Sequence, residues 1–215
     1  MHTARRPARA DASSARLCAV SPARLALLAA TAGVAALLIV GLLELGGGSG
    51  SGQPSRLTPA AMQARLRGSP PQLAALHAHA GQLLPGGLGA LRGRLAALRG
   101  TPVVINKWAS WCGPCRAEFG AFQQVSVARG REVAFIGIDS GDSSKGAAEA
   151  FLRSFPVSYP SYWDAGGQAG AAITDSSFTP VTVFLDRRGG EYIHQGPYPG
   201  AARLERDVQR YALGG

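Results

Sequence analysis

Cysteine is scarce in this 215-residue chain, and its scarcity excludes several classes of protein. Only three cysteines occur, and beyond residue 45 the sole pair is Cys112 and Cys115. A framework of structural disulfides needs more cysteines at wider spacings, so it is excluded. A zinc site needs a second pair of Cys or His ligands, and His77 and His79, two residues apart, would point to different faces of a helix. We therefore expect no metal site.

Lysine is almost absent as well, with two lysines against 20 arginines. The formal net charge is +9, yet the basic residues form no continuous run and no aromatic residues are interleaved with them. Continuous basic runs with interleaved aromatic residues are typical of nucleic-acid-binding proteins, and this chain has neither. We therefore expect no nucleic-acid partner.

Long apolar runs are also rare, and the one that exists lies near the N-terminus. Residues 25–43 carry no charge and are bracketed by Arg24 and Glu44. As a helix this stretch spans roughly 28 Å, close to the hydrocarbon thickness of a bilayer. Five arginines and one aspartate precede it, which predicts a cytoplasmic segment 1–24 and a single-pass anchor over 25–45 in the cell membrane.

A cleaved signal peptide is the alternative interpretation of the same stretch. Its apolar part is longer than in a usual signal peptide and no Ala-x-Ala follows it, which favours an uncleaved signal-anchor. Either way the chain after residue 45 is expected to be extracytoplasmic. Cys18 precedes the apolar stretch, so it is not a lipid-attachment cysteine of the cleaved kind, and no role is assigned to it.

Residues 46–100 separate the apolar stretch from the chemistry-bearing part of the chain. Residues 46–55 are rich in Gly and Ser and form a flexible linker. Residues 56–100 are rich in Ala and Leu and predict three helices, begun by Thr58-Pro59, by Ser69-Pro70 and near Leu88. This helical extension carries no chemical motif. It either packs on the sheet predicted below or docks a partner.

From residue 101 to 215 the pattern alternates between strand and helix. Short apolar runs predict buried strands, and amphipathic stretches predict the helices that follow them. A closing hairpin and helix complete a mixed-sheet α/β sandwich. The expected strands are Val103–Trp108, Val133–Ile138, Val181–Leu185 and Tyr192–Gln195, and the expected helices are 113–129, 144–155, 164–173 and 201–212.

The motif Trp111-Cys112-Gly113-Pro114-Cys115 places two thiols one helical turn apart, directly after a buried strand. Cys112 would stand at the start of a helix, where unpaired N–H groups and the helix dipole favour a thiolate. Cys115 lies within reach to resolve a mixed disulfide. Gly113 and Pro114 set the turn and influence the redox potential, and Trp111 forms an apolar lip beside Cys112 or packs in the core. The motif indicates dithiol–disulfide exchange, without its direction.

The segment from Lys107 to Phe119 resembles the active site of the thioredoxin superfamily, and more narrowly that of membrane-anchored, extracytoplasmic oxidoreductases of the TlpA/ResA type. Asp139, the segment 155–160 and Thr179-Pro180 before a strand support this resemblance. It implies a thioredoxin-like fold over about 101–212. It also implies that Pro180 is cis and lies against the disulfide, and that the backbone of Thr179 pairs with an extended substrate chain. An ordinary trans turn proline is the alternative.

Three further residues bear on the cysteines. The resemblance implies that Glu118 tunes the thiols and relays protons, whereas the alternative is a solvated helix residue. Asn106 stands where many thioredoxins have a buried acid, and a neutral amide cannot be that base. Lys107 occupies a strand position that is usually apolar, so it either extends to solvent or lies near the cysteines and stabilises a thiolate.

The leading hypothesis is a membrane-tethered thiol–disulfide oxidoreductase acting on exported proteins. The resemblance favours a reductase, for which apocytochrome c cysteines are one candidate client. No cofactor is expected, because electrons would pass to or from a dithiol protein in the membrane. An oxidase or isomerase, a peroxiredoxin-like peroxidase and a non-catalytic binding module remain alternatives. The direction of electron flow, the client and the oligomeric state are left open.

Overall fold

The computed structural model describes residues 57–215, which form one compact unit. Residues 1–24, the anchor over 25–45, the linker 46–55 and Cys18 lie outside the described residues. Within 57–215 no helix is both long and apolar enough to cross a membrane.

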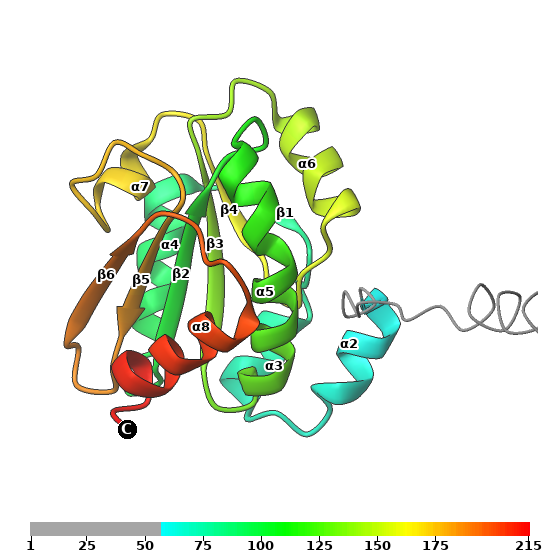
Figure 1. The fold of residues 1–215 in the computed structure, drawn as a ribbon, viewed down its shortest axis with the longest axis vertical. Coiled ribbons are helices and arrows are strands. Elements are labelled where there is room, and N and C mark those ends of the chain that lie inside the picture. The colour runs from blue at the N-terminus through cyan, green and yellow to red at the C-terminus, as the bar shows by residue number, and fades with distance from the viewer. Residues whose placement is uncertain (1–56) are drawn as a thin grey trace, which may run out of the picture. The chain divides into compact units, whose positions relative to one another are not determined.

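Six strands form a single mixed sheet in the order β1-β4-β3-β2-β5-β6 (Figure 1). Strands β1 to β4 run parallel to one another, β5 runs antiparallel to β2, and β6 runs antiparallel to β5. Parallel strands need crossover connections, and the helices supply them. The strands are β1 (Leu83–Leu84), β2 (Val103–Trp108), β3 (Ala134–Ser140), β4 (Ser161–Asp164), β5 (Val181–Leu185) and β6 (Glu191–Gln195).

Helices cover both faces of the sheet. One face packs against α5, α6 and α8, and the other against α3, α4 and α7 (Figure 1). A π-helical segment, Val208–Ala212, continues α8. The helices are α2 (Pro59–Arg65), α3 (Pro71–His77), α4 (Gly87–Ala97), α5 (Gly113–Arg129), α6 (Lys145–Ser154), α7 (Gln168–Ala171) and α8 (Ala201–Asp207).

The alternation of β2 decides which side chains reach the start of α5. Val104 and Trp108 belong to the core beneath α5, whereas Val103 and Ile105 belong to the core on the opposite face. Because strand side chains alternate, Asn106 points toward α5 and Lys107 points away from it.

Most of the expected elements are confirmed, with shifts of a residue or two at their ends. The helical extension is the main correction: it also contains β1, which pairs with β4 and joins the sheet. Leu73 and Leu91 of this extension are buried in the core against the sheet, which confirms packing as its structural role. Strand β4, which lies between α6 and α7, was not predicted from the sequence.

The three expected helix starts at Thr58, Ser69 and Asp164 have different outcomes. The hydroxyl of Thr58 accepts from the backbone of Ala61 and caps α2 as predicted, but Ser69 does not cap α3, because its hydroxyl donates to the carbonyl of Leu66. Asp164 does accept backbone N–H groups at the start of α7, although that helix is much shorter than the predicted 164–173.

Candidate active site

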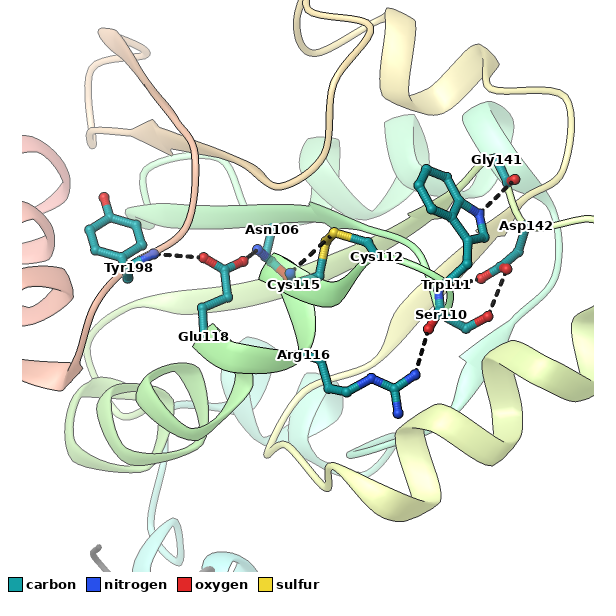
Figure 2. Close-up of a disulfide and its surroundings, with 10 residues drawn as sticks. All are labelled: Asn106, Ser110, Trp111, Cys112, Cys115, Arg116, Glu118, Gly141, Asp142 and Tyr198. Atoms are coloured by element: carbon teal, nitrogen blue, oxygen red, sulfur yellow. Dashed lines mark hydrogen bonds between the residues drawn. A yellow bond between two sulfur atoms is a disulfide. The ribbon is translucent and has the colours of Figure 1, made fainter.

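The two cysteines of the motif form a disulfide at the N-terminus of α5 (Figure 2). Cys112 is the N-cap residue, and its Sγ accepts a hydrogen bond from the backbone N–H of Cys115 at 3.1 Å. Pro114 lies in the first turn, where its missing N–H breaks no helical bond. The N-cap position thus offers a donor to the sulfur that would carry negative charge as a thiolate.

The peptide bond between Thr179 and Pro180 is cis, as the resemblance implied. Pro180 directly precedes β5, and Val181 pairs with Lys107 near the end of β2. From that end of β2 the chain continues to Cys112. Sheet pairing therefore brings the cis-proline to the same edge of the sheet as the disulfide.

A groove of about 500 Å³ lies at this edge, and both Trp111 and Thr179 line it. The side chain of Trp111 is 65% exposed, which excludes a core role, and its indole N–H donates to the carbonyl of Gly141 at 3.2 Å. Phe178, beside Thr179 in the sequence, is 76% exposed. An exposed aromatic side chain in the wall of a groove, as at Trp111, is typical of a binding surface.

Glu118 is fully buried, which excludes the solvated alternative. Its Oε1 accepts from Nδ2 of Asn106 at 2.8 Å, and its Oε2 accepts from the backbone N–H of Tyr198 at 3.0 Å (Figure 2). Burial raises the pKa of Glu118 to about 7, and the two hydrogen bonds oppose that rise. A carboxyl group with this pKa exchanges protons readily at neutral pH.

Asn106 is the partner of Glu118 rather than an independent group. Its Nδ2 donates to the carboxylate, while its Oδ1 is buried without a hydrogen-bond donor among the described residues. Both residues were singled out from the sequence, but nothing in the sequence indicated that they touch.

Lys107 lies on the face of the sheet opposite α5. Its Nζ donates to the carbonyl of Ser176 at 2.6 Å, and its side chain lines the same groove as Trp111 and Thr179. Burial lowers the pKa of Lys107, and the negative charge of Asp164 partly offsets this.

Sequence reasoning missed the contacts that hold the segment before Cys112. Asp142 accepts two hydrogen bonds from Ser110, and Arg116 donates to the carbonyl of Ser110 (Figure 2). The available signal was an acidic residue, Asp139, at the end of an apolar strand, followed closely by Asp142.

No group of three or more His, Cys, Asp or Glu side chains within residues 57–215 could hold a metal ion. His77 is buried, and its two ring nitrogens contact the carbonyls of Ser158 and Gly130. The residue therefore links α3 to two loops.

Comparison with known proteins identifies the family. The Redoxin family model matches residues 92–199, about half of the chain. The chain is 30% identical to the thioredoxin-like protein YneN of Bacillus subtilis over 93 residues, which are 42% of this chain and 54% of YneN. It is 31% identical to the thiol-disulfide oxidoreductase ResA of the same organism over 96 residues, 44% of this chain and 52% of ResA. The chain thus spans about half the length of these curated relatives.

A solved structure of a related protein is also similar to this chain. MTB dsbF, in its mixed oxidized and reduced forms, superposes with a TM-score of 0.50 at 27% identity, over 54% of this chain and 84% of dsbF. The matched region of the family model contains the Cys112–Cys115 disulfide and the Thr179–Pro180 cis bond. The chain belongs to the Redoxin family and is a TlpA/ResA-like member of the thioredoxin superfamily.

Proposed function

We propose that this protein is a thiol–disulfide oxidoreductase that exchanges the Cys112–Cys115 disulfide with protein thiols. The observation that carries the proposal is the disulfide at the N-cap of α5, with Cys112 accepting the N–H of Cys115. The relatives that are named thiol-disulfide oxidoreductases support it. The groove lined by Trp111 and Thr179 supplies a surface on which an extended substrate chain can lie.

In the reductive direction, the Cys112 thiolate attacks one sulfur of a substrate disulfide, and the other substrate sulfur leaves as a thiolate that takes a proton. Cys115 then loses its proton and attacks the Cys112 sulfur, which releases the second substrate sulfur and closes the Cys112–Cys115 disulfide. The substrate gains two electrons and two protons. Glu118, three residues after Cys115 on the same side of α5, is the group we assign to accept the Cys115 proton.

We assign the reductase direction and an extracytoplasmic location on the strength of the TlpA/ResA resemblance and of the uncharged stretch 25–43. Exported proteins are then the substrates, and the cysteines of an apocytochrome c are the client class to test first. Electrons would come from a dithiol protein in the membrane. The direction, the location and the client are parts of the proposal, because the chain aligns with only about half the length of its relatives.

The test is insulin reduction by the full chain in detergent micelles, with dithiothreitol as the electron source. We expect Cys112→Ser to abolish catalysis and Cys115→Ser to accumulate a mixed disulfide with insulin, because only the second step is lost. Cys18→Ser is the matched control, since it removes the remaining cysteine and should leave the rate unchanged.

Full insulin reduction by the Cys112→Ser variant would overturn the proposal. Retention of a partner by a chain lacking both cysteines, without catalysis by the wild type, would instead support a binding module. Rapid consumption of hydrogen peroxide by the reduced chain would support a peroxidase.

A further inference from the structure

The end of β3 carries a buried acid that the exchange mechanism does not use. Asp139 is fully buried, and both of its carboxylate oxygens lack a hydrogen-bond partner among the described residues. Its neighbours in the sheet are Trp108 on β2 and Trp163 on β4. A buried carboxylate without donors is strongly disfavoured, so this position favours the neutral acid.

Three residues along the chain, Asp142 holds the segment that leads into Cys112. Asp142 is 4% exposed, its Oδ2 accepts from the backbone N–H of Ser110, and its Oδ1 accepts from the Ser110 hydroxyl, both at 2.7 Å. The indole N–H of Trp111 donates to the carbonyl of Gly141. The loop after β3 therefore binds the two residues that precede Cys112.

The same segment is also held from the side of α5. Arg116 donates to the carbonyl of Ser110 at 2.9 Å, and its guanidinium lies over the rings of Phe151 and Phe155 on the α6 side. Ser110 thus has its N–H, its hydroxyl and its carbonyl all engaged. These contacts restrict the backbone conformation of the segment that leads into Cys112.

The two acids are electrostatically coupled. Burial is the main cause that raises the pKa of Asp139 to about 9, and the neighbouring Asp142 and the charge of Asp164 add to the rise. A neutral Asp139 places no second negative charge near Asp142, whose two oxygens accept from Ser110.

Other charged groups near this region have their own partners. Glu118 on α5 binds Asn106 and Tyr198. Lys107 donates to Ser176, and Lys145 pairs with Glu149 on the exposed side of α6. Arg116 is thus the cation that the structure places on the Ser110 segment itself.

We propose that Asp142 is a positioning residue for Cys112, and that the buried Asp139 leaves this hold on the Ser110–Trp111 segment undisturbed only while it remains neutral. When Asp139 ionises, two adjacent carboxylates repel each other and the hold on Ser110 loosens. The effect on disulfide exchange rests on the proposed function, whereas the protonation of Asp139 does not.

The protonation is tested by NMR titration of the oxidised full chain in micelles, labelled at the Asp carboxyl carbons, the Ser amide and the Trp indole. The disulfide keeps both cysteines from titrating. We expect the Asp139 carboxyl signal to titrate near pH 9, with the Ser110 amide and Trp111 indole signals shifting at the same midpoint. A Glu118 step is expected near pH 7, so the two are separable.

Two variants test whether Asp139 causes the step near pH 9. Asp139→Asn has nearly the shape of the neutral acid but cannot ionise, so the step near pH 9 should vanish from the Ser110 and Trp111 signals. A step caused by Lys107 instead would remain in this variant. Glu132→Gln, which removes an exposed and remote acid, should retain the step. Titration of Asp139 below pH 6, or a Trp111 step that persists in Asp139→Asn, would overturn the proposal.

The positioning role is tested by alkylation of Cys112 in the reduced Cys115→Ser chain. The Asn side chain in Asp142→Asn has one acceptor oxygen, so it can accept only one of the two hydrogen bonds from Ser110. We expect the alkylation of Cys112 at pH 7 to slow by about tenfold, which is equivalent to roughly one unit in the thiol pKa. Ser110→Ala loses only the hydroxyl bond and should give a smaller decrease. An unchanged alkylation rate in Asp142→Asn would refute the positioning role while leaving insulin reduction, and so the proposed function, intact.

Discussion

Glu118 and Asn106 form a pair that can accommodate either protonation state of the acid. When Glu118 is ionised, Nδ2 of Asn106 donates to it, as the structure shows. When Glu118 is protonated, it needs an acceptor, and Oδ1 of Asn106 is buried without a donor. Reversal of the Asn106 amide would present that oxygen to the acid. The amide of Asn106 can therefore serve both protonation states of Glu118, which the proposed proton relay requires, without being the base.

The buried acid makes the stability of the protein depend on pH. The pKa of Glu118 is about 7 in the folded state against 4.5 in an unfolded chain, so the folded state holds this proton more tightly. This tighter proton binding stabilises the folded state. The stabilisation is fully present below the pKa of the unfolded state and is lost as pH rises through the pKa of the folded state. Between these values the free energy of unfolding should fall by about 3 kcal/mol. Urea unfolding at several pH values measures this fall.

Glu118→Gln isolates that contribution from those of other groups, including Asp139. Gln cannot ionise, and its amide N–H can donate to Oδ1 of a reversed Asn106. We expect the variant to lose about 3 kcal/mol less than the wild type between pH 4.5 and pH 8. The exposed Glu132→Gln should follow the wild type. Equal pH dependence in Glu118→Gln and the wild type would show that the pKa of Glu118 is the same in the folded and unfolded states.

The sequence left open whether Lys107 extends to solvent or stabilises a thiolate at the cysteines. Its ammonium is held by the Ser176 carbonyl, on the face of the sheet opposite α5. We therefore expect Lys107→Met to leave the pH profile of Cys112 alkylation within about twofold of the wild type. The KM for insulin should rise, because the groove wall near Ser176 loses its hydrogen bond. A marked slowing of alkylation would instead support stabilisation of the thiolate by Lys107.

At the scale of the elements, sequence reasoning succeeded where the pattern is local. The strand β2 and the helix α5 have the predicted bounds, because continuous apolar runs and a helix opened by Gly113-Pro114 need no distant information. The strands β1 and β4 were missed because they are short and are defined by pairing: Leu83 pairs with Ser161, far along the chain. The same holds for the active site, where Glu118 meets Tyr198 across 80 positions.

The side chain of Gln123 attaches the start of the described chain to α5. Gln123 is 4% exposed, accepts from the N–H of Leu57, and donates to the carbonyls of Leu57 and Pro156. We expect Gln123→Ala to lower the free energy of unfolding by about 2 kcal/mol, since it removes three hydrogen bonds, and to speed proteolysis near Leu57.

The neighbouring Gln124→Ala is the matched control, because Gln124 bonds only within its own helix, to the Gly120 carbonyl. It should change stability by less than about 0.5 kcal/mol. If the two variants were equally stable and equally resistant to protease, the attachment of Leu57 to α5 would contribute nothing.

At the scale of the whole molecule, the topology concentrates the chemistry at one edge of the sheet. The parallel strands β2 and β3 end there, which places Cys112 and the Ser110–Asp142 contacts side by side. The antiparallel β5 begins there, which brings Pro180. Ligand sites of α/β sheets usually lie at the carboxyl ends of parallel strands, and this fold follows that rule. The residues could be named from the sequence, but only the sheet order brings them together.

The reduction potential of the full chain is the property that fixes its direction. At neutral pH and above, the ionised Glu118 would disfavour a thiolate in the reduced state and so favour the disulfide, which lowers the potential. We therefore expect a value near that of thioredoxin, about −270 mV, measured at pH 8 in glutathione or dithiothreitol buffers. Such a protein would act as a reductase supplied with electrons.

Glu118→Gln tests the physical cause of that potential. Removing the negative charge should raise the value at pH 8 by about 30 mV, which is a tenfold change in the equilibrium constant for two electrons. At pH 5 Glu118 is mostly protonated, so wild type and variant should differ far less. Glu132→Gln should have the wild-type potential at both pH values. A wild-type potential near −120 mV would mark an oxidant that makes disulfides, and the reductase direction and the apocytochrome c client would both be abandoned.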